Sequence, residues 1–246
     1  MFRYQLLIEY EGTKFLGWQS QPKGISVQST IEKKLSKFLK EKIKLIGAGR
    51  TDKGVHAISQ SSHFDTKKLI NNKFKFLNSL NFFLKKNQIS IIDIKKRKND
   101  FHARYSAKKR IYKYIILNRS SRPSLELGRV WFVIKYLDIK ILKKGAKILE
   151  GTHDFSAYRS SKCSAKNPIR KIDYIKVKKI NESIVIKLQS KSFLQQQVRG
   201  MVGCLKYLAE GKWDIKNFKN VLKSKKRSSC APPAPPEGLY LEKVIY

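Results

Sequence analysis

Acidic residues are scarce in this chain of 246 residues: 18 Asp or Glu stand against 54 Lys or Arg, which leaves a formal net charge of +36. Cysteine is scarcer. Cys163, Cys204 and Cys230 are widely spaced with no CxxC pair, which argues against a disulfide framework or a zinc knuckle. No window reaches the ~18 apolar residues of a membrane span, and Glu9 and Glu11 lie where a signal peptide would be apolar. We therefore expect a cytoplasmic protein without metal or redox chemistry.

The basic excess has two explanations. Of the 54 cationic residues, 42 are Lys, a bias that AT-rich coding produces without any selection for charge. Such a surface nevertheless attracts polyanions, because binding of phosphates releases their counterions. Nucleic acid is the favoured partner and an anionic membrane surface the weaker alternative. Since 41% of the residues are hydrophobic, the charge belongs to a folded protein and not to a disordered tail.

Hydrophobic periodicity predicts the order β-α-β-β-α-β in the first half of the chain. The expected elements are strands at 3–10, 43–48, 60–65 and 89–95 and helices at 26–39 and 67–84. A similar order extends over the second half, with strands at 104–117, 130–134, 169–178, 183–188 and 239–245, helices at 139–149, 192–210 and 215–222, and a turn or short strand at 154–158. The pattern predicts an α+β fold of two halves, 1–103 and 104–246, each with an antiparallel sheet.

One segment, GAGRTDKGVHA at 47–57, stands out from the Lys-rich background. Its glycines have P-loop spacing, but Val55 and His56 occupy the places where that loop needs Lys and Ser or Thr. What remains is Asp52 between Arg50 and Lys53, whose charges favour the ionised carboxylate. An ionised Asp repels phosphate, so it suits a nucleophile or general base. The alternative, that Asp52 only caps a turn, has equal weight on this segment alone.

Two further segments carry possible site residues. Residues 101–118 interleave cations with aromatics, including Arg110 and Tyr112, a pattern that suits phosphates and bases. For Tyr114, on the same face, we favour a structural role in a cross-strand ladder. In the helix expected after residue 192, Arg199 follows apolar residues and needs a carboxylate partner, for which Asp52 is a natural candidate.

Together these motifs resemble the TruA-type tRNA pseudouridine synthases. GRTDKGVHA matches the catalytic motif of that family, and YEGTKFLGWQ at 10–19 resembles its first signature, with Glu11 where Asp is frequent. The similarity continues through FHARYSA and RIYKY, GTHDFSAY at 151–158, Arg170, FLQQQVRGMVG at 193–203 and APPAPPEGLYLEKVIY at 231–246. Several motifs in one order across the whole chain make a chance match very improbable.

The resemblance implies conversion of uridine to pseudouridine at positions 38, 39 and 40 of the tRNA anticodon arm, without cofactor or metal. Asp52 corresponds to the nucleophile, which attacks the base or the sugar or abstracts a ribose proton. Tyr112 corresponds to the tyrosine that stacks on the target base and takes the C5 proton, and Arg199 to the arginine that pairs with the nucleophile. The substrate would contact Arg50, which helps to flip the base, together with Lys53, His56, Arg110, Tyr112 and Leu239, the last under the uracil.

The family also implies two ferredoxin-like halves around a basic cleft, and a homodimer. This chain departs from the family pattern at Gln195–Gln197, at Gly200 and in the spacing of Pro233 and Pro236. Gly200 is expected to weaken its helix by roughly 1 kcal/mol relative to Ala. Two alternatives remain: a basic tRNA-binding module that has lost catalysis, and, remotely, a metal-dependent nuclease, for which His153 and Asp154 lack acidic companions.

Overall fold

A computed structural model describes all of residues 1–246, and the chain forms two compact units. Unit 1 consists of Met1–Lys108 with Tyr240–Tyr246, and unit 2 of Lys109–Leu239. The expected halves, 1–103 and 104–246, place the last strand in the second half, whereas its residues from Tyr240 onward belong to unit 1. The chain end is held there by hydrogen bonds: the Lys108 amide donates to the Ile245 carbonyl, and the Tyr246 hydroxyl donates to the Ala103 carbonyl.

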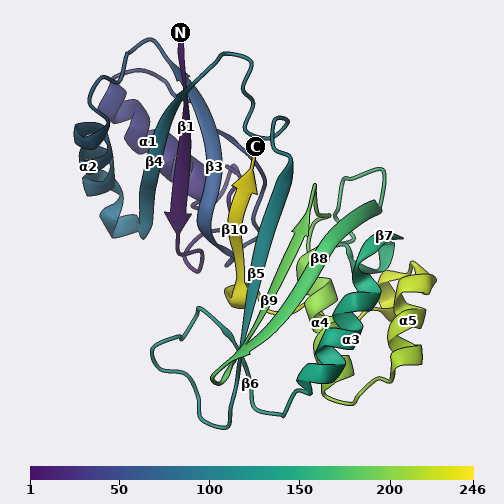
Figure 1. Ribbon diagram of the computed structural model, residues 1–246. Helices are drawn as coiled ribbons and strands as arrows, with labels where there is room; N and C mark the ends of the chain where they lie inside the picture. The colour runs from purple at the N-terminus through teal and green to yellow at the C-terminus, as the bar shows by residue number, and fades with distance from the viewer. The chain divides into compact units, whose positions relative to one another are not determined.

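Unit 1 has the predicted order of strands and helices (Figure 1). Its elements are β1 (Phe2–Tyr10), α1 (Val27–Leu39), β2 (Ile46–Gly47), β3 (His56–Thr66), α2 (Lys73–Leu84), the short 3-10 helix η1 (Lys85–Asn87), β4 (Ile89–Arg97) and most of β10 (Leu239–Ile245). β1 lies between β4 and β3 and is antiparallel to both, and β3 also pairs with β2 and, in parallel, with β10. The parallel pair makes this sheet mixed, whereas the sequence predicted an antiparallel one.

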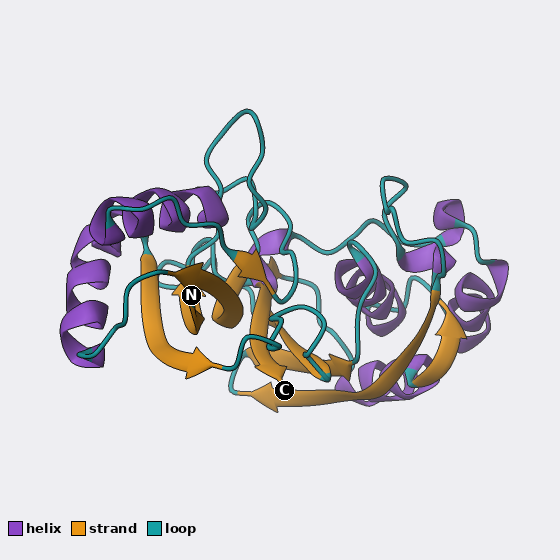
Figure 2. Cartoon of the chain, turned by 90° about the horizontal axis from the view of Figure 1, so that it is seen from above, coloured by secondary structure: helices purple, strands orange, loops and turns teal.

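Both helices of unit 1 pack by an apolar stripe and lie on one face of the sheet (Figure 2). Helix α1 begins where the sequence predicts, because the Ser26 side chain accepts from the Ser29 amide and the Ser29 side chain accepts from the Ser26 amide. Its predicted apolar positions Ile31 and Leu35 are buried. Helix α2 begins six residues later than expected, since Asn72 caps it by accepting from the Lys75 amide.

In unit 2 the strands pair in the order β6-β5-β9-β8-β7. Its elements are β5 (Lys109–Asn118), β6 (Trp131–Val133), α3 (Ile139–Leu149), β7 (Gly151–Asp154), η2 (Ser156–Tyr158), β8 (Ile169–Ile180), β9 (Ser183–Ser190), α4 (Gln197–Ala209), α5 (Ile215–Ser224), η3 (Arg227–Ser229) and η4 (Pro236–Gly238). Only β5 and β6 pair in parallel. The predicted hairpin turns at Asn181, which has a left-handed φ of 52°.

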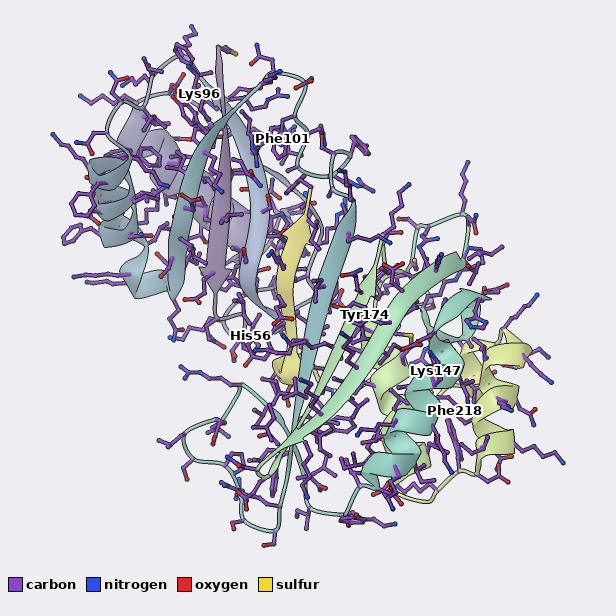
Figure 3. The ribbon with its side chains drawn as sticks, viewed as in Figure 1. His56, Lys96, Phe101, Lys147, Tyr174 and Phe218 are labelled. Carbon is purple, nitrogen blue, oxygen red and sulfur yellow. The ribbon has the colours of Figure 1, made fainter.

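The core of unit 2 lies where α3 packs against β8, α4 and α5. Phe155, Phe218 and, on β5, Tyr114 are fully buried in this unit, and Phe218 is labelled in Figure 3. Strand β5 begins five residues later than expected, and helix α4 begins at Gln197 instead of residue 192, since Gln196 before it has a left-handed φ of 61°. No helix in either unit is both long and apolar enough to cross a membrane.

Candidate functional site

Asp52 lies in the loop that joins β2 to β3. The loop is anchored at its start by the Ala48 amide, which donates to the Ser61 carbonyl at 2.7 Å. After Asp52 the chain turns back: the Val55 amide donates to the Asp52 carbonyl at 3.2 Å, and Gly54 has a φ of +77° that only glycine adopts easily. The turn presents a partly exposed Asp52 side chain just before the start of β3.

The first signature motif, YEGTKFLGWQ, forms the support for this loop. The Trp18 amide donates to the Thr51 carbonyl at 3.1 Å. A Cβ atom on Gly12 would lie 2.1 Å from the Val55 carbonyl oxygen, and one on Gly17, whose φ is +103°, would lie 2.5 Å from the Thr51 carbonyl oxygen. The two motifs therefore pack backbone against backbone, and glycine is required where they meet.

Buried polar groups complete this support. The hydroxyls of Tyr10 and Thr51 share a hydrogen bond of 2.8 Å. The His56 side chain is only 2% exposed, accepts from the Gly12 amide at Nδ1 over 3.0 Å, and stacks on the Tyr240 ring at 4.7 Å (His56 is labelled in Figure 3). Because Nδ1 accepts, a neutral His56 carries its proton on Nε2. These contacts connect the His56 ring to the loop, and its predicted contact with the substrate stays a prediction.

The two cations beside Asp52 are exposed. Arg50 donates from Nε to the Gln19 side-chain oxygen at 3.0 Å, so its guanidinium is attached to the end of the first motif. Directly before Arg50, the Gly49 carbonyl accepts a hydrogen bond from the Gln60 side-chain amide at 2.9 Å. The loop backbone is thus held from several sides, while Arg50 and Lys53 extend toward solvent.

In unit 2, β5 carries Arg110, Tyr112 and Tyr114 at alternate positions, which places them on one face. Tyr112 is partly exposed, and its ring meets the Phe193 ring edge-on at 5.2 Å. Tyr114 is fully buried and donates to the Pro235 carbonyl at 2.7 Å, and burial raises its pKa well above 10. The structural role predicted for Tyr114 is therefore confirmed.

Arg199 lies in the first turn of α4 and is tied to the proline-rich segment. Its Nε donates to the Ala234 carbonyl at 2.6 Å, and the Ala234 amide donates back to the Arg199 carbonyl at 2.9 Å. The start of the helix depends on one of the unusual glutamines: Gln197 is fully buried, and its side-chain oxygen accepts from the Leu194 amide at 2.8 Å. These bonds fix the direction in which the Arg199 side chain leaves the helix.

The glycines of α4 have a packing role that the sequence did not predict. A Cβ atom on Gly200 would lie 2.7 Å from the Tyr158 carbonyl oxygen, and one on Gly203 would lie 2.1 Å from the Pro232 carbonyl oxygen. Helix propensity alone predicted that Gly200 weakens its helix relative to Ala, but the methyl group of Ala would overlap the Tyr158 carbonyl at this position. The GxxG spacing lets two chain segments approach one face of the helix.

The same proline-rich segment leads to Leu239. Gly238 packs so closely that a Cβ atom there would lie 2.7 Å from the Tyr114 ring. Leu239 follows at the start of β10, and its side chain is 5% exposed. Tyr114 and Gly238 together determine where this strand begins.

The structure places the candidate residues in two groups. Arg50, Asp52, Lys53 and His56 belong to unit 1, and Arg110, Tyr112, Arg199 and Leu239 belong to unit 2. The pairing of Arg199 with Asp52 stays a prediction. In neither unit do three or more His, Cys, Asp or Glu side chains gather in a way that suits a metal ion.

Comparison with known proteins relates the chain to one family. The family model described as tRNA pseudouridine synthase matches residues 6–106 and 146–246. The tRNA pseudouridine synthase A of Pelagibacter ubique is 63% identical over the full length of both chains, and that of Parvibaculum lavamentivorans is 39% identical over the full length of both. A solved Cbf5–Nop10–Gar1 complex gives a TM-score of 0.36 at 11% identity, covering 83% of this chain and 53% of that one, a likeness too slight to support an argument.

Proposed function

The chain belongs to the tRNA pseudouridine synthase family, and from that premise we propose that it converts uridine to pseudouridine at positions 38, 39 and 40 of the anticodon stem-loop of tRNA. The observation that carries the proposal is the Asp52 loop. Two separate motifs pack together through backbone contacts at Gly12 and Gly17, with buried His56 beneath them, and present one carboxylate among cations. A module that only binds RNA has no need for such a loop.

The reaction is an isomerisation, so it needs no external redox partner. The bond between ribose C1′ and uracil N1 breaks, the uracil turns, and C1′ joins C5, which loses its proton while N1 gains one. Asp52 acts as the ionised nucleophile or base. Tyr112, partly exposed with its ring set by Phe193, stacks on the uracil and accepts the C5 proton. Arg199 holds the Asp52 carboxylate in its charged form.

The target uridine has to leave the stem stack before a carboxylate can reach it. We assign this step to Arg50, whose attachment to Gln19 leaves its charged head exposed. Lys53 and Arg110 bind phosphates, and Leu239 packs under the uracil. His56 acts through the loop that it supports, as its burial indicates.

The fold and the dimer are expected from the resemblance, and the location from the sequence composition. We propose two ferredoxin-like halves, a homodimer that binds tRNA with both subunits, and a cytoplasmic location where tRNA is processed. Unit 1 supports the first ferredoxin-like half, because its strands pair in the order β4-β1-β3-β2 and, along the chain, α1 follows β1 and α2 follows β3. We propose that the reaction needs neither cofactor nor metal.

The decisive variant is Asp52→Asn, with Asp100→Asn as a matched control that removes the same charge from an exposed position of unit 1. Asp52→Asn should abolish pseudouridine formation in unmodified tRNA and leave tRNA affinity nearly intact. The control should retain full activity. Sites are mapped on the product tRNA, and modification only outside positions 38–40 would overturn the target assignment. Full activity in Asp52→Asn would refute the catalytic role of Asp52. An inactive wild-type protein that binds tRNA tightly would instead favour the non-catalytic binding module.

A further inference from the structure

Two cysteines that are far apart in the sequence lie side by side in unit 2. Cys204 is in α4 and Cys230 directly follows η3, yet their sulfur atoms are 3.3 Å apart. The third cysteine, Cys163, is partly exposed and serves as an internal reference. The wide spacing in the sequence argued against a disulfide framework, but the fold brings two of the three thiols together.

The surroundings of the two sulfurs differ. Cys204 is fully buried, whereas Cys230 is partly exposed, and its sulfur lies 3.8 Å from the Gly200 carbonyl oxygen. Tyr158, the last residue of η2, is 1% exposed, and its buried hydroxyl has no hydrogen-bond partner. The pair thus lies at the edge of a packed interior, and a small molecule from solvent reaches Cys230 first.

The two thiols also differ in acidity. The hydrogen bond from Cys204 lowers the pKa of Cys230, and the positive charge of Arg227 adds to that effect. The same hydrogen bond, together with burial, raises the pKa of Cys204. Cys230 is therefore the sulfur that ionises and attacks, and Cys204 keeps its proton until a second step.

We propose that Cys204 and Cys230 form a reversible disulfide by exchange with a low-molecular-weight disulfide. The Cys230 thiolate attacks one sulfur of the small disulfide and releases the other as a thiol, leaving a mixed disulfide on Cys230. Cys204 then loses its proton and attacks the Cys230 sulfur, which releases the second small thiol. Two protein thiols are oxidised and one disulfide is reduced. The sulfurs need to approach by only about 1 Å to reach the ~2.0 Å of a disulfide.

The bond would attach α4 covalently to the segment that follows Cys230. That segment already receives hydrogen bonds from Arg199, at the Ala234 carbonyl, and from Tyr114, at the Pro235 carbonyl. Because the bridge closes a loop of about 25 residues, it restricts the unfolded chain and should raise the thermal unfolding midpoint by about 5–10 °C.

The test treats the purified full-length protein with oxidised glutathione under native conditions, followed by alkylation with N-ethylmaleimide and intact mass and peptide analysis. The intact mass of the wild type should fall by two hydrogens, and two fewer thiols should react with N-ethylmaleimide. Peptide analysis should show Cys204 linked to Cys230, and the thermal unfolding midpoint should be higher. Cys204→Ser should stop with one glutathione on Cys230, and Cys230→Ser should form neither product at that pair. Cys163 reports on general accessibility.

Several outcomes would overturn the proposal: a wild type that carries glutathione on Cys204 or Cys230 without bridging them, one that reacts only at Cys163, or a Cys204→Ser variant whose Cys230 stays unmodified. Because every readout is a mass or a melting curve, the result is independent of whether the chain modifies tRNA.

Discussion

Gly12 offers the sharpest test of how the Asp52 loop is held. Replacement by Ala would place a Cβ atom 2.1 Å from the Val55 carbonyl oxygen and 2.5 Å from its carbon. Contacts this short do not persist, so one of the two backbones has to move by about 1 Å. The φ of Gly12 is not positive, so Gly12→Ala introduces steric overlap without backbone strain of its own.

The size of the effect follows from that displacement. Overpacking of this kind costs ~1–3 kcal/mol of unfolding free energy. Displacement of a catalytic group by about 1 Å costs ~100-fold in rate, and the Val55 amide is bonded to the Asp52 carbonyl. We therefore expect kcat/KM for Gly12→Ala to fall by about 100-fold. Affinity for tRNA should change little, because the exposed cations to which we assign phosphate binding remain.

The assay measures tritium released from tRNA that carries [5-³H]uridine, since C5 loses its proton in the reaction, alongside urea unfolding and tRNA binding. Gly49→Ala is the matched control: Gly49 lies in the same loop, its φ is not positive, and a Cβ atom there would meet nothing within 4 Å. The control should keep its stability and most of its activity. A folded Gly12→Ala within about threefold of wild-type activity, or a Gly49→Ala equally impaired, would refute the steric account.

Three other predictions concern stability and charge. Tyr114→Phe leaves the partly buried Pro235 carbonyl without its donor, and we expect the free energy of unfolding in urea to fall by ~0.5–1.5 kcal/mol. An unchanged midpoint would contradict this. Burial lowers the pKa of His63 from 6.5 to about 4, so between these pH values the imidazole is protonated in the unfolded chain and neutral in the folded chain. The free energy of unfolding should therefore fall by up to ~1.4 kcal/mol per pH unit as the pH drops from 6.5 to 4. His63→Asn should flatten that part of the stability curve, and an unchanged slope would assign the effect to other groups. Lys96 and Lys98 lie at the opposite end of the unit 1 sheet from the Asp52 loop. Changes of these lysines to Gln should weaken tRNA binding and reduce the slope of log affinity against log salt concentration by about one unit for each phosphate that is no longer neutralised. An altered choice of target uridine would show that the two lysines do more than supply background charge.

Local patterns were sufficient where a helix or strand depends on its own residues. Helix 139–149 and strand 239–245 were predicted with the bounds that the structure shows, and α1 follows its Ser26 cap. Predictions were less accurate where distant contacts decide the outcome. β2 keeps only two of six expected residues, and α4 begins late because Gln196 has a left-handed φ, next to a buried Gln197 side chain that accepts from the Leu194 amide. The periodicity of apolar residues does not predict such hydrogen bonds.

Residue types at short, fixed spacings were enough to identify the family, its chemistry and the loop that carries Asp52. The glycines of these motifs are explained only by the packing of the folded chain, since each of Gly12, Gly17, Gly200 and Gly203 is required by a carbonyl oxygen from a distant part of the chain. The same packing buries His56 against the loop and brings Cys204 to Cys230. A linear pattern shows which groups are present, but whether two groups share a few ångströms of space depends on how the whole chain packs.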